Sequence, residues 1–146
     1  MHTAPTLPSS IVSLHADRWT APFWEAARGH RLVAPRCTTC GAFRLPPAPF
    51  CWRCRAQDVE WVELSGRGTV YSFTVTRQAL IPQLKDSVPY VAAVIALEGV
   101  PGVRLVSNIV DVDPASVRIG MPVAVAWDDV DDHTTLPRFL PVEGSR

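Results

Sequence analysis

The alternation of apolar and polar positions predicts short β-strands in the second half of the chain. In the segment 69–77, Tyr71, Phe73 and Val75 fall on one face of an extended strand, with polar residues on the other. The predicted strands span residues 59–64, 69–77, 90–97, 103–110 and 121–127. Five short strands with glycines at their corners fit a small closed barrel of the OB type, with a five-stranded sandwich or an SH3-like barrel as alternatives.

Two of these segments are apolar at nearly every position. YVAAVIAL (90–97) and VAVAW (123–127) lack the alternation expected of strands with one wet face, so another element or another protein must cover their outer faces. The intervening loop, 78–89, carries Leu80 and Ile81 at expected surface positions. We interpret this loop as an interaction surface, with a plug over the barrel mouth as the alternative.

A short helix is expected upstream, over residues 17–28. Thr20 is a candidate N-cap, Pro22 lies in the first turn and Gly29 can end the helix. Its apolar stripe can dock on the same chain or on another protein, because a two-turn helix is marginal in isolation. The predicted organisation is a flexible leader (1–16), the helix with a cysteine-rich segment (17–58), the barrel (59–129) and a C-terminal tail (130–146).

All four cysteines lie in this cysteine-rich segment, as two C-x-x-C pairs. Cys37 and Cys40 form the first pair, and Cys51 and Cys54 follow ten residues later. This spacing is typical of a zinc ribbon, in which four thiolates close a tetrahedron around one structural zinc ion. Iron in a rubredoxin-like site uses the same ligands. Gly41 can take the positive φ that follows the first pair, whereas Arg55 in the matching place suggests a different second knuckle.

Composition excludes several classes of protein. Hydrophobic residues make up 47% of the 146 residues, the formal net charge is zero and the pI is about 6.9. No global field therefore attracts nucleic acid or an anionic membrane. No apolar run reaches the ~20 residues that a bilayer-spanning helix needs, and the N-terminal sequence does not resemble a signal peptide. We expect a cytoplasmic protein, where two disulfides would not form.

Local charge is uneven. Six arginines and no acidic residue lie between residues 28 and 55, and four of these arginines flank the cysteines: Arg36, Arg44, Arg53 and Arg55. Such a basic ribbon can contact the phosphates of a nucleotide-like ligand or an acidic partner. No nucleophile–base pair, phosphate-binding loop or H-E-x-x-H motif is present, and His30 is interpreted as a surface or packing residue. We therefore predict no catalytic residues in this chain.

The order of motifs resembles one family. PFWEAARGHRL, C-x-x-C-G, LPPAPFC-x-x-C, SGRGTVYSFTVT, PYVAAVIALEG and IGMPVAVAW follow one another between residues 21 and 127. The sequence resembles bacterial and archaeal proteins that join a rubredoxin-like zinc ribbon to an acyl-CoA-associated OB fold, known as domain of unknown function thirty-five.

This resemblance implies an accessory subunit. Such proteins are partners of thiolase-superfamily enzymes, including acyl-CoA thiolases, acyltransferases and the lipid-transfer-protein-like aldolases that shorten steroid side chains. The partner carries the catalytic groups, and the ribbon and OB subunit stabilises it and helps to shape the acyl-CoA channel, in a hetero-oligomer. The competing functions are a single-strand nucleic-acid binder, disfavoured by the lack of Lys and Arg in strands 69–75 and 90–97, and a free-standing acyl-CoA-binding protein.

Overall fold

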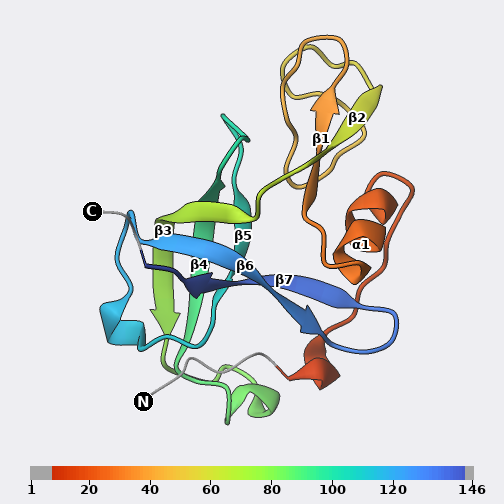
Figure 1. Cartoon of the computed structure of the whole chain (residues 1–146). Helices are drawn as coiled ribbons and strands as arrows, with labels where there is room; N and C mark the ends of the chain where they lie inside the picture. The colour runs from red at the N-terminus through yellow and green to blue at the C-terminus, as the bar shows by residue number, and fades with distance from the viewer. Residues whose placement is uncertain (1–7, 144–146) are drawn as a thin grey trace.

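The computed structural model describes residues 8–143, which form a five-stranded barrel with a zinc-ribbon-like extension (Figure 1). The barrel strands are β3 (Arg67–Thr76), β4 (Tyr90–Leu97), β5 (Leu105–Ile109), β6 (Pro122–Asp129) and β7 (Thr135–Pro141). They close in the order β3-β4-β5-β7-β6. The prediction of a mainly β chain with a five-stranded OB-type barrel is confirmed.

The membership of the barrel differs from the prediction at both ends. The first predicted strand is β2 (Val59–Glu63), which pairs antiparallel with β1 (Val33–Cys37) in the extension instead of joining the barrel. Its place is taken by β7, which lies in the predicted C-terminal tail and pairs along its whole length with β6. The chain after residue 129 is therefore part of the barrel up to Pro141, because β6 would otherwise present an open edge.

A β-bulge in β3 changes the predicted face of Tyr71. The register with β4 shifts between Val70 and Ser72, so Tyr71 is an extra residue in the strand. Val70 and Phe73 consequently both point into the barrel, and Tyr71 is 53% exposed beneath the guanidinium of Arg104. The simple alternation of residues 69–77 thus fails at one position.

The helix α1 (Ala21–Arg28) is shorter than the predicted 17–28 and docks on the same chain. Asp17 instead accepts hydrogen bonds from the backbone N–H groups of Trp19 and Thr20, which form a turn before the helix. The helix contacts β7 of the barrel and β1 of the extension. Its buried Phe23 belongs to the same core cluster as Ile95 and Phe139 of the barrel, so one core joins the parts of the fold.

The remaining segments are short. Residues 1–7 of the predicted leader lie outside the described residues, and residues 8–16 contain the 3-10 helix η1 (Ser9–Ile11). The 3-10 helices η2 (Pro82–Leu84) and η3 (Pro114–Ser116) lie in the β3–β4 and β5–β6 connections. Within residues 8–143, no helix has the length and apolar character needed to cross a membrane.

Candidate metal centre and adjoining surfaces

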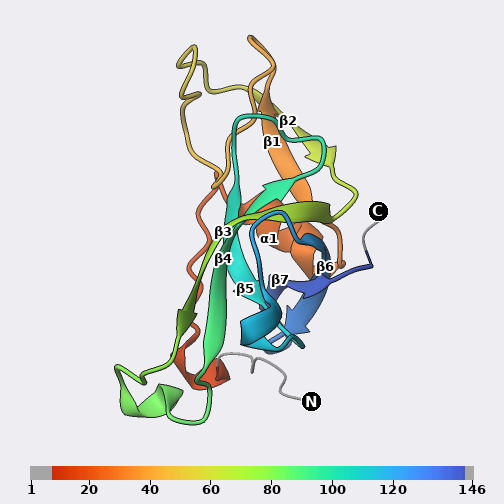
Figure 2. The same ribbon diagram turned by 90° about the vertical axis from the view of Figure 1, so that its left-hand side faces the viewer.

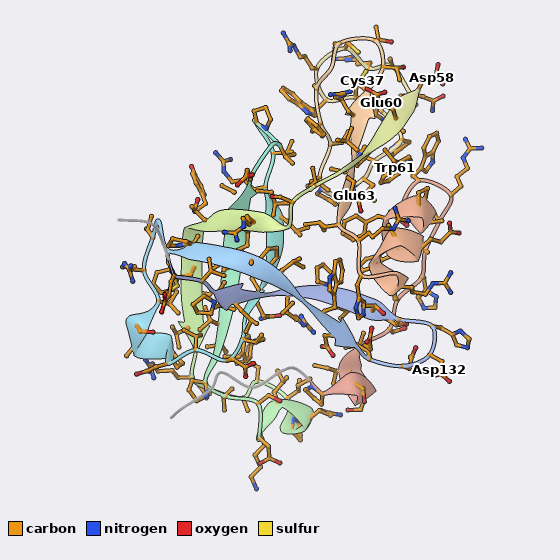
Figure 3. All side chains as sticks on the ribbon, viewed as in Figure 1. Cys37, Asp58, Glu60, Trp61, Glu63 and Asp132 are labelled. Atoms are coloured by element: carbon orange, nitrogen blue, oxygen red, sulfur yellow. The ribbon has the colours of Figure 1, made fainter. Side chains whose placement is uncertain are left out.

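The four cysteines meet at the outer end of the β1–β2 extension. Cys37 is the last residue of β1, and Figure 3 places it at the far end of the extension from the barrel. Within the described residues, these four Sγ atoms form the one group of three or more potential metal ligands, and all lie within 4.8 Å of one another. Cys37 and Cys51 are buried, and Cys54 is exposed.

The sulfur positions fit a tetrahedral metal ion. The Sγ atoms of Cys37 and Cys54 are 3.5 Å apart, and those of Cys40 and Cys51 are 3.6 Å apart. A regular tetrahedron with Zn–S bonds of about 2.3 Å has sulfur–sulfur edges of about 3.8 Å. The residues present therefore fit a zinc ion, and with four protein ligands no coordination position is left for a substrate. Such a zinc would be structural.

The two knuckles have the same backbone geometry, contrary to the expectation that Arg55 would make the second one different. Gly41 and Arg55 both have positive φ, 81° and 66°. The N–H groups of Gly41 and Arg55 donate to the carbonyl oxygens of Cys37 and Cys51, respectively, at 2.9 Å. The N–H groups of Cys37 and Cys51 in turn donate to the carbonyl oxygens of Ala42 and Ala56, at 2.8 Å. The loop closes with a non-glycine residue in the left-handed region, at a cost in conformational strain.

Backbone N–H groups favour thiolates at the buried ligands. The N–H of Cys40, followed by that of Thr39, lowers the pKa of the Cys37 thiol to about 6. The N–H of Cys54 similarly lowers the pKa of Cys51. At Cys54, a hydrogen bond from the backbone of Ala56 favours the thiolate, but partial desolvation of the sulfur and the three neighbouring cysteine side chains outweigh it and raise the pKa to about 11. The cluster is thus prepared for a cation, which would relieve this mutual repulsion.

The four arginines singled out near the cysteines have different environments. Arg44 is only 2% exposed and donates to the carbonyl oxygens of Ala48 and Ala56, at 2.9 and 3.1 Å. Its guanidinium ties the chain after the first knuckle to the second knuckle, which gives Arg44 a structural role; its contact with a ligand or partner stays a prediction. Arg36 donates from Nε to Glu60 at 2.7 Å, on the neighbouring strand.

The charge around the centre is less positive than the sequence suggested. Asp58, Glu60 and Glu63 lie on or next to β2, beside the arginine-bearing β1 (Figure 3). Arg53 and Arg55 are exposed and take part in no salt bridge of the described chain. They remain the free cations of the second knuckle.

His30 and the acidic residues of the barrel have structural contacts. His30 lies away from the cysteines, where its ring stacks on Trp127 with centroids 5.7 Å apart and its Nε2 lies 2.9 Å from Asp129. The interpretation of His30 as a surface packing residue agrees with this placement. The hydrogen bonds from His30 and then Thr135 lower the pKa of Asp129. Asp128 accepts a hydrogen bond from Arg138 Nε at 3.3 Å.

The β3–β4 loop reaches beyond the end of the barrel (Figure 2). Leu80 is 80% exposed and Ile81 is 43% exposed, while Leu84 of η2 is buried. Leu80 and Ile81 therefore do not plug the barrel mouth. Both remain predicted partner contacts.

An apolar groove, which the sequence did not reveal, lies between the parts of the fold. It has a volume of about 480 Å³ and separates α1 and the loop containing Pro46 from strands β4, β5 and β7. Ala92 and Val106, on the outer face of the barrel, line it together with Arg138. No sequence signal marks the groove, because its walls come from segments that are far apart in the chain.

Comparison with known proteins identifies both parts of the chain. Residues 24–60 match the ChsH2 rubredoxin-like zinc ribbon domain, and residues 61–128 match the ChsH2 C-terminal OB-fold domain. A DUF35 domain-containing scaffold protein of Methanocaldococcus jannaschii is 36% identical over 141 residues, covering 91% of this chain and 98% of that protein.

Two further similarities concern CoA thioesters and an aldolase. The 3-oxo-4,17-pregnadiene-20-carboxyl-CoA hydratase alpha subunit of Mycobacterium tuberculosis is 37% identical over 86% of this chain. The chain spans 36% and 39% of the length of the two hydratase alpha subunits that it matches. A chain of the solved Ltp2-ChsH2(DUF35) aldolase is 40% identical, with a TM-score of 0.77, covering 88% of this chain and 98% of that one. The chain therefore belongs to the DUF35 family of proteins, which join a ChsH2-type rubredoxin-like zinc ribbon to an OB fold.

Proposed function

We propose that this chain is a non-catalytic, zinc-containing accessory subunit of a thiolase-superfamily complex that acts on acyl-CoA thioesters. The observation that carries the proposal is the 40% identity to a chain of the Ltp2-ChsH2(DUF35) aldolase over nearly all of that chain. The four-cysteine cluster supports the structural role of the metal, since a closed thiolate site offers no position for substrate.

The reaction we propose for the complex is carbon–carbon bond cleavage of the retro-aldol type on a steroid side chain held as a CoA thioester. Similarity to an aldolase chain and to a hydratase subunit named for a pregnadiene carboxyl-CoA favours this reaction. A thiolase or an acyltransferase is the second candidate, because the family resemblance extends to partners of those enzymes. In either case the complex is a hetero-oligomer, and the thiolate ligands favour the reducing cytoplasm as its location.

The surfaces for the partner and for CoA are proposed from exposure. Leu80 and Ile81 place apolar area at the end of the barrel, where burial against a partner would be favourable. Arg53 and Arg55 offer two uncompensated charges that suit either CoA phosphates or an acidic face of the partner. Arg36 belongs to the same proposal only if the ligand competes with Glu60.

Co-expression tests the complex. A thiolase-like protein encoded beside this chain should co-purify with it, and the pair should cleave a steroid side-chain CoA thioester while this chain alone should not. Leu80→Asp should abolish activity of the pair and leave the zinc content unchanged, whereas Lys85→Ala, in the same exposed loop, should have little effect. Cleavage by this chain alone, undiminished by a catalytic mutation in the partner, would overturn the proposal.

The two roles of the arginines are separated by a double variant. In Arg53→Ala/Arg55→Ala, a CoA role predicts weaker acyl-CoA binding by an intact complex. A partner role predicts lost assembly with unchanged CoA affinity in the complex that remains. The matched control is Arg118→Ala, which removes an exposed arginine of the β5–β6 connection. No change in either quantity would reject both roles.

A further inference from the structure

The two edges of the β1–β2 sheet differ in how their main-chain groups are bonded. On the outer edge of β1, the N–H of Cys37 donates to the carbonyl of Ala42 at 2.8 Å, and the carbonyl of Pro35 accepts from the N–H of Arg44 at 3.0 Å. The ribbon therefore covers that edge with its own chain. In this two-stranded sheet of the described residues, no strand lies beyond β2 (Figure 1).

The register of the sheet determines which main-chain groups of β2 point outward. The N–H of Leu64 donates to the carbonyl of Leu32 at 2.8 Å, and the N–H of Thr38 donates to the carbonyl of Asp58 at 3.1 Å. Bonding alternates along an antiparallel strand, so every second residue from 58 to 64 directs its N–H and C=O toward β1. The three residues between them direct theirs away from β1: Val59, Trp61 and Glu63.

These outward main-chain groups are open to another chain. Within residues 8–143, the N–H and C=O groups of Val59, Trp61 and Glu63 form no main-chain hydrogen bond on this side of β2. Glu63 is exposed, and the other two residues are partly exposed. An extended chain placed about 4.8 Å from β2 would bond to all three residues, as in the recognition of peptides by strand addition.

The side chains along β2 indicate which strand fits the edge. Asp58, Glu60 and Glu63 are exposed and lie on or next to β2 (Figure 3). Glu60 is paired with Arg36, whereas Asp58 and Glu63 take part in no salt bridge of the described chain. Opposite charges on neighbouring strands are favourable and like charges are not. A second copy of β2 would bring the same carboxylates to the edge, so charge favours a basic strand over a dimer.

We propose that the free edge of β2 binds an extended basic segment of another protein, which adds to the β1–β2 sheet as a third, antiparallel strand. The outward main-chain groups of Val59, Trp61 and Glu63 supply the hydrogen bonds. The carboxylates of Asp58 and Glu63 select lysine or arginine in the added strand and oppose pairing with acidic strands. The site is complete within this chain, so the proposal does not rest on the proposed complex.

The probe is the peptide acetyl-Thr-Lys-Val-Ile-Lys-Val-Lys-amide. In the antiparallel register that places its isoleucine opposite Trp61, its three lysines lie opposite Glu63, Glu60 and Asp58. Titration of the full zinc-loaded chain, followed by amide NMR, should shift the amide signals of Val59, Trp61 and Glu63. The same peptide with glutamate in place of each lysine should bind at least about tenfold more weakly.

Two N-methylated peptides test strand addition itself. N-methylation of the isoleucine removes the N–H that would donate to the carbonyl of Trp61, so binding should weaken by about tenfold or more. N-methylation of the middle lysine is the matched control. In the same register that N–H points away from β2, so the affinity should stay within about twofold of the parent peptide.

Two double variants of the chain test the selection by charge. Asp58→Lys/Glu63→Lys replaces both unpaired carboxylates and should reverse the preference, so that the glutamate peptide binds more tightly than the lysine peptide. The matched control is Asp86→Lys/Asp132→Lys. It changes the net charge by the same amount at exposed positions outside the β1–β2 extension and should keep the preference of the parent chain.

Each contrary result has a definite meaning. Failure of the lysine peptide to bind the parent chain, or equal preferences in the two double variants, would overturn the proposal. Charge-dependent binding with equal effects of the two N-methylations would reveal an ionic contact without an added strand and would also overturn it. If Asp58→Lys/Glu63→Lys fails to fold, the N-methylated peptides decide on the parent chain. Concentration-dependent protection of the β2 amides in the free chain would identify a second copy as the occupant and overturn the basic segment.

Discussion

The ribbon tip (residues 37–58) and the barrel are stabilised by different interactions. In the ribbon tip the buried side chains are two cysteines, Phe43 and Arg44, too few to form an apolar core. The barrel buries a continuous cluster that includes Ile95, Ile109 and Phe139 at 0% exposure. The comparison indicates that metal binding determines the fold of one region and apolar burial that of the other.

Loss of the metal gives the largest expected effect. Structural zinc contributes on the order of 10–16 kcal/mol in zinc-finger peptides, so Cys37→Ser should unfold the ribbon tip and leave much of the barrel intact. Elemental analysis and amide hydrogen exchange measure the two outcomes separately. Thr39→Ala changes an exposed residue between two ligands and should retain one zinc per chain. Equal loss of protection in β4 would show that the two regions do not unfold independently.

A core substitution in the barrel should produce the converse result. Ile95→Ala removes a side chain at 0% exposure and should lower the free energy of unfolding by about 2–5 kcal/mol. The zinc content of the folded chain should not change. Ile119→Ala, at an exposed position in the β5–β6 connection, should lie within about 0.5 kcal/mol of the parent in denaturant unfolding. Loss of zinc from the folded Ile95→Ala chain would contradict the conclusion that the ribbon tip and the barrel are stabilised separately.

The two regions also differ in how far the sequence predicts them. The ribbon follows from cysteine spacing alone, because four ligands of one ion must meet whatever the intervening chain does. For the barrel, the number of strands is right but one member is wrong. Residues 59–64 have the pattern of a barrel strand, and nothing local reveals that their partner is β1, which contains Pro35 and ends in a metal ligand.

The missed strand β7 has a physical explanation. TLPRFLP contains two prolines, which argue against a strand with two paired edges. In the structure β7 pairs fully with β6 but has a single paired position with β5, Ile109 with Phe139. Proline is tolerated along such a sparsely paired edge. The groove was missed for a related reason, because one of its walls, with Arg138, lies on β7 and the others come from distant segments of the chain.

The two knuckles allow a smaller, internal comparison of the ribbon. Gly41 and Arg55 occupy equivalent left-handed positions, and a Cβ at Gly41 would meet nothing within 4 Å. Gly41→Ala should therefore weaken zinc binding through backbone strain alone, by about 1 kcal/mol, and Arg55→Gly should strengthen it by a similar or smaller amount. Competition with a chelator measures both, and a difference of about 1 kcal/mol is about a fivefold change. Changes of the same sign would contradict equivalent knuckles.

The smallest expected effect concerns the ion pair that links the helix end to the barrel. His30 follows α1 and bonds Asp129 of β6, and this bond is the main cause of the lowered pKa of Asp129. Because the pKa of Asp129 is lower in the folded chain than its ordinary value of 3.8, the ionised carboxylate stabilises the fold at pH values above 3.8. This stabilisation is lost as the pH falls through the lowered pKa and the carboxylate is protonated. Asp129→Asn should therefore be less stable than the parent at about pH 5, with the difference disappearing at strongly acid pH. Because both side chains are about half exposed, solvent screening keeps the effect small.

Asp132→Asn, in the β6–β7 turn labelled in Figure 3, is the control and should follow the parent at every pH in thermal unfolding. A difference that grows toward acid pH would have the opposite sign and would contradict this role of Asp129.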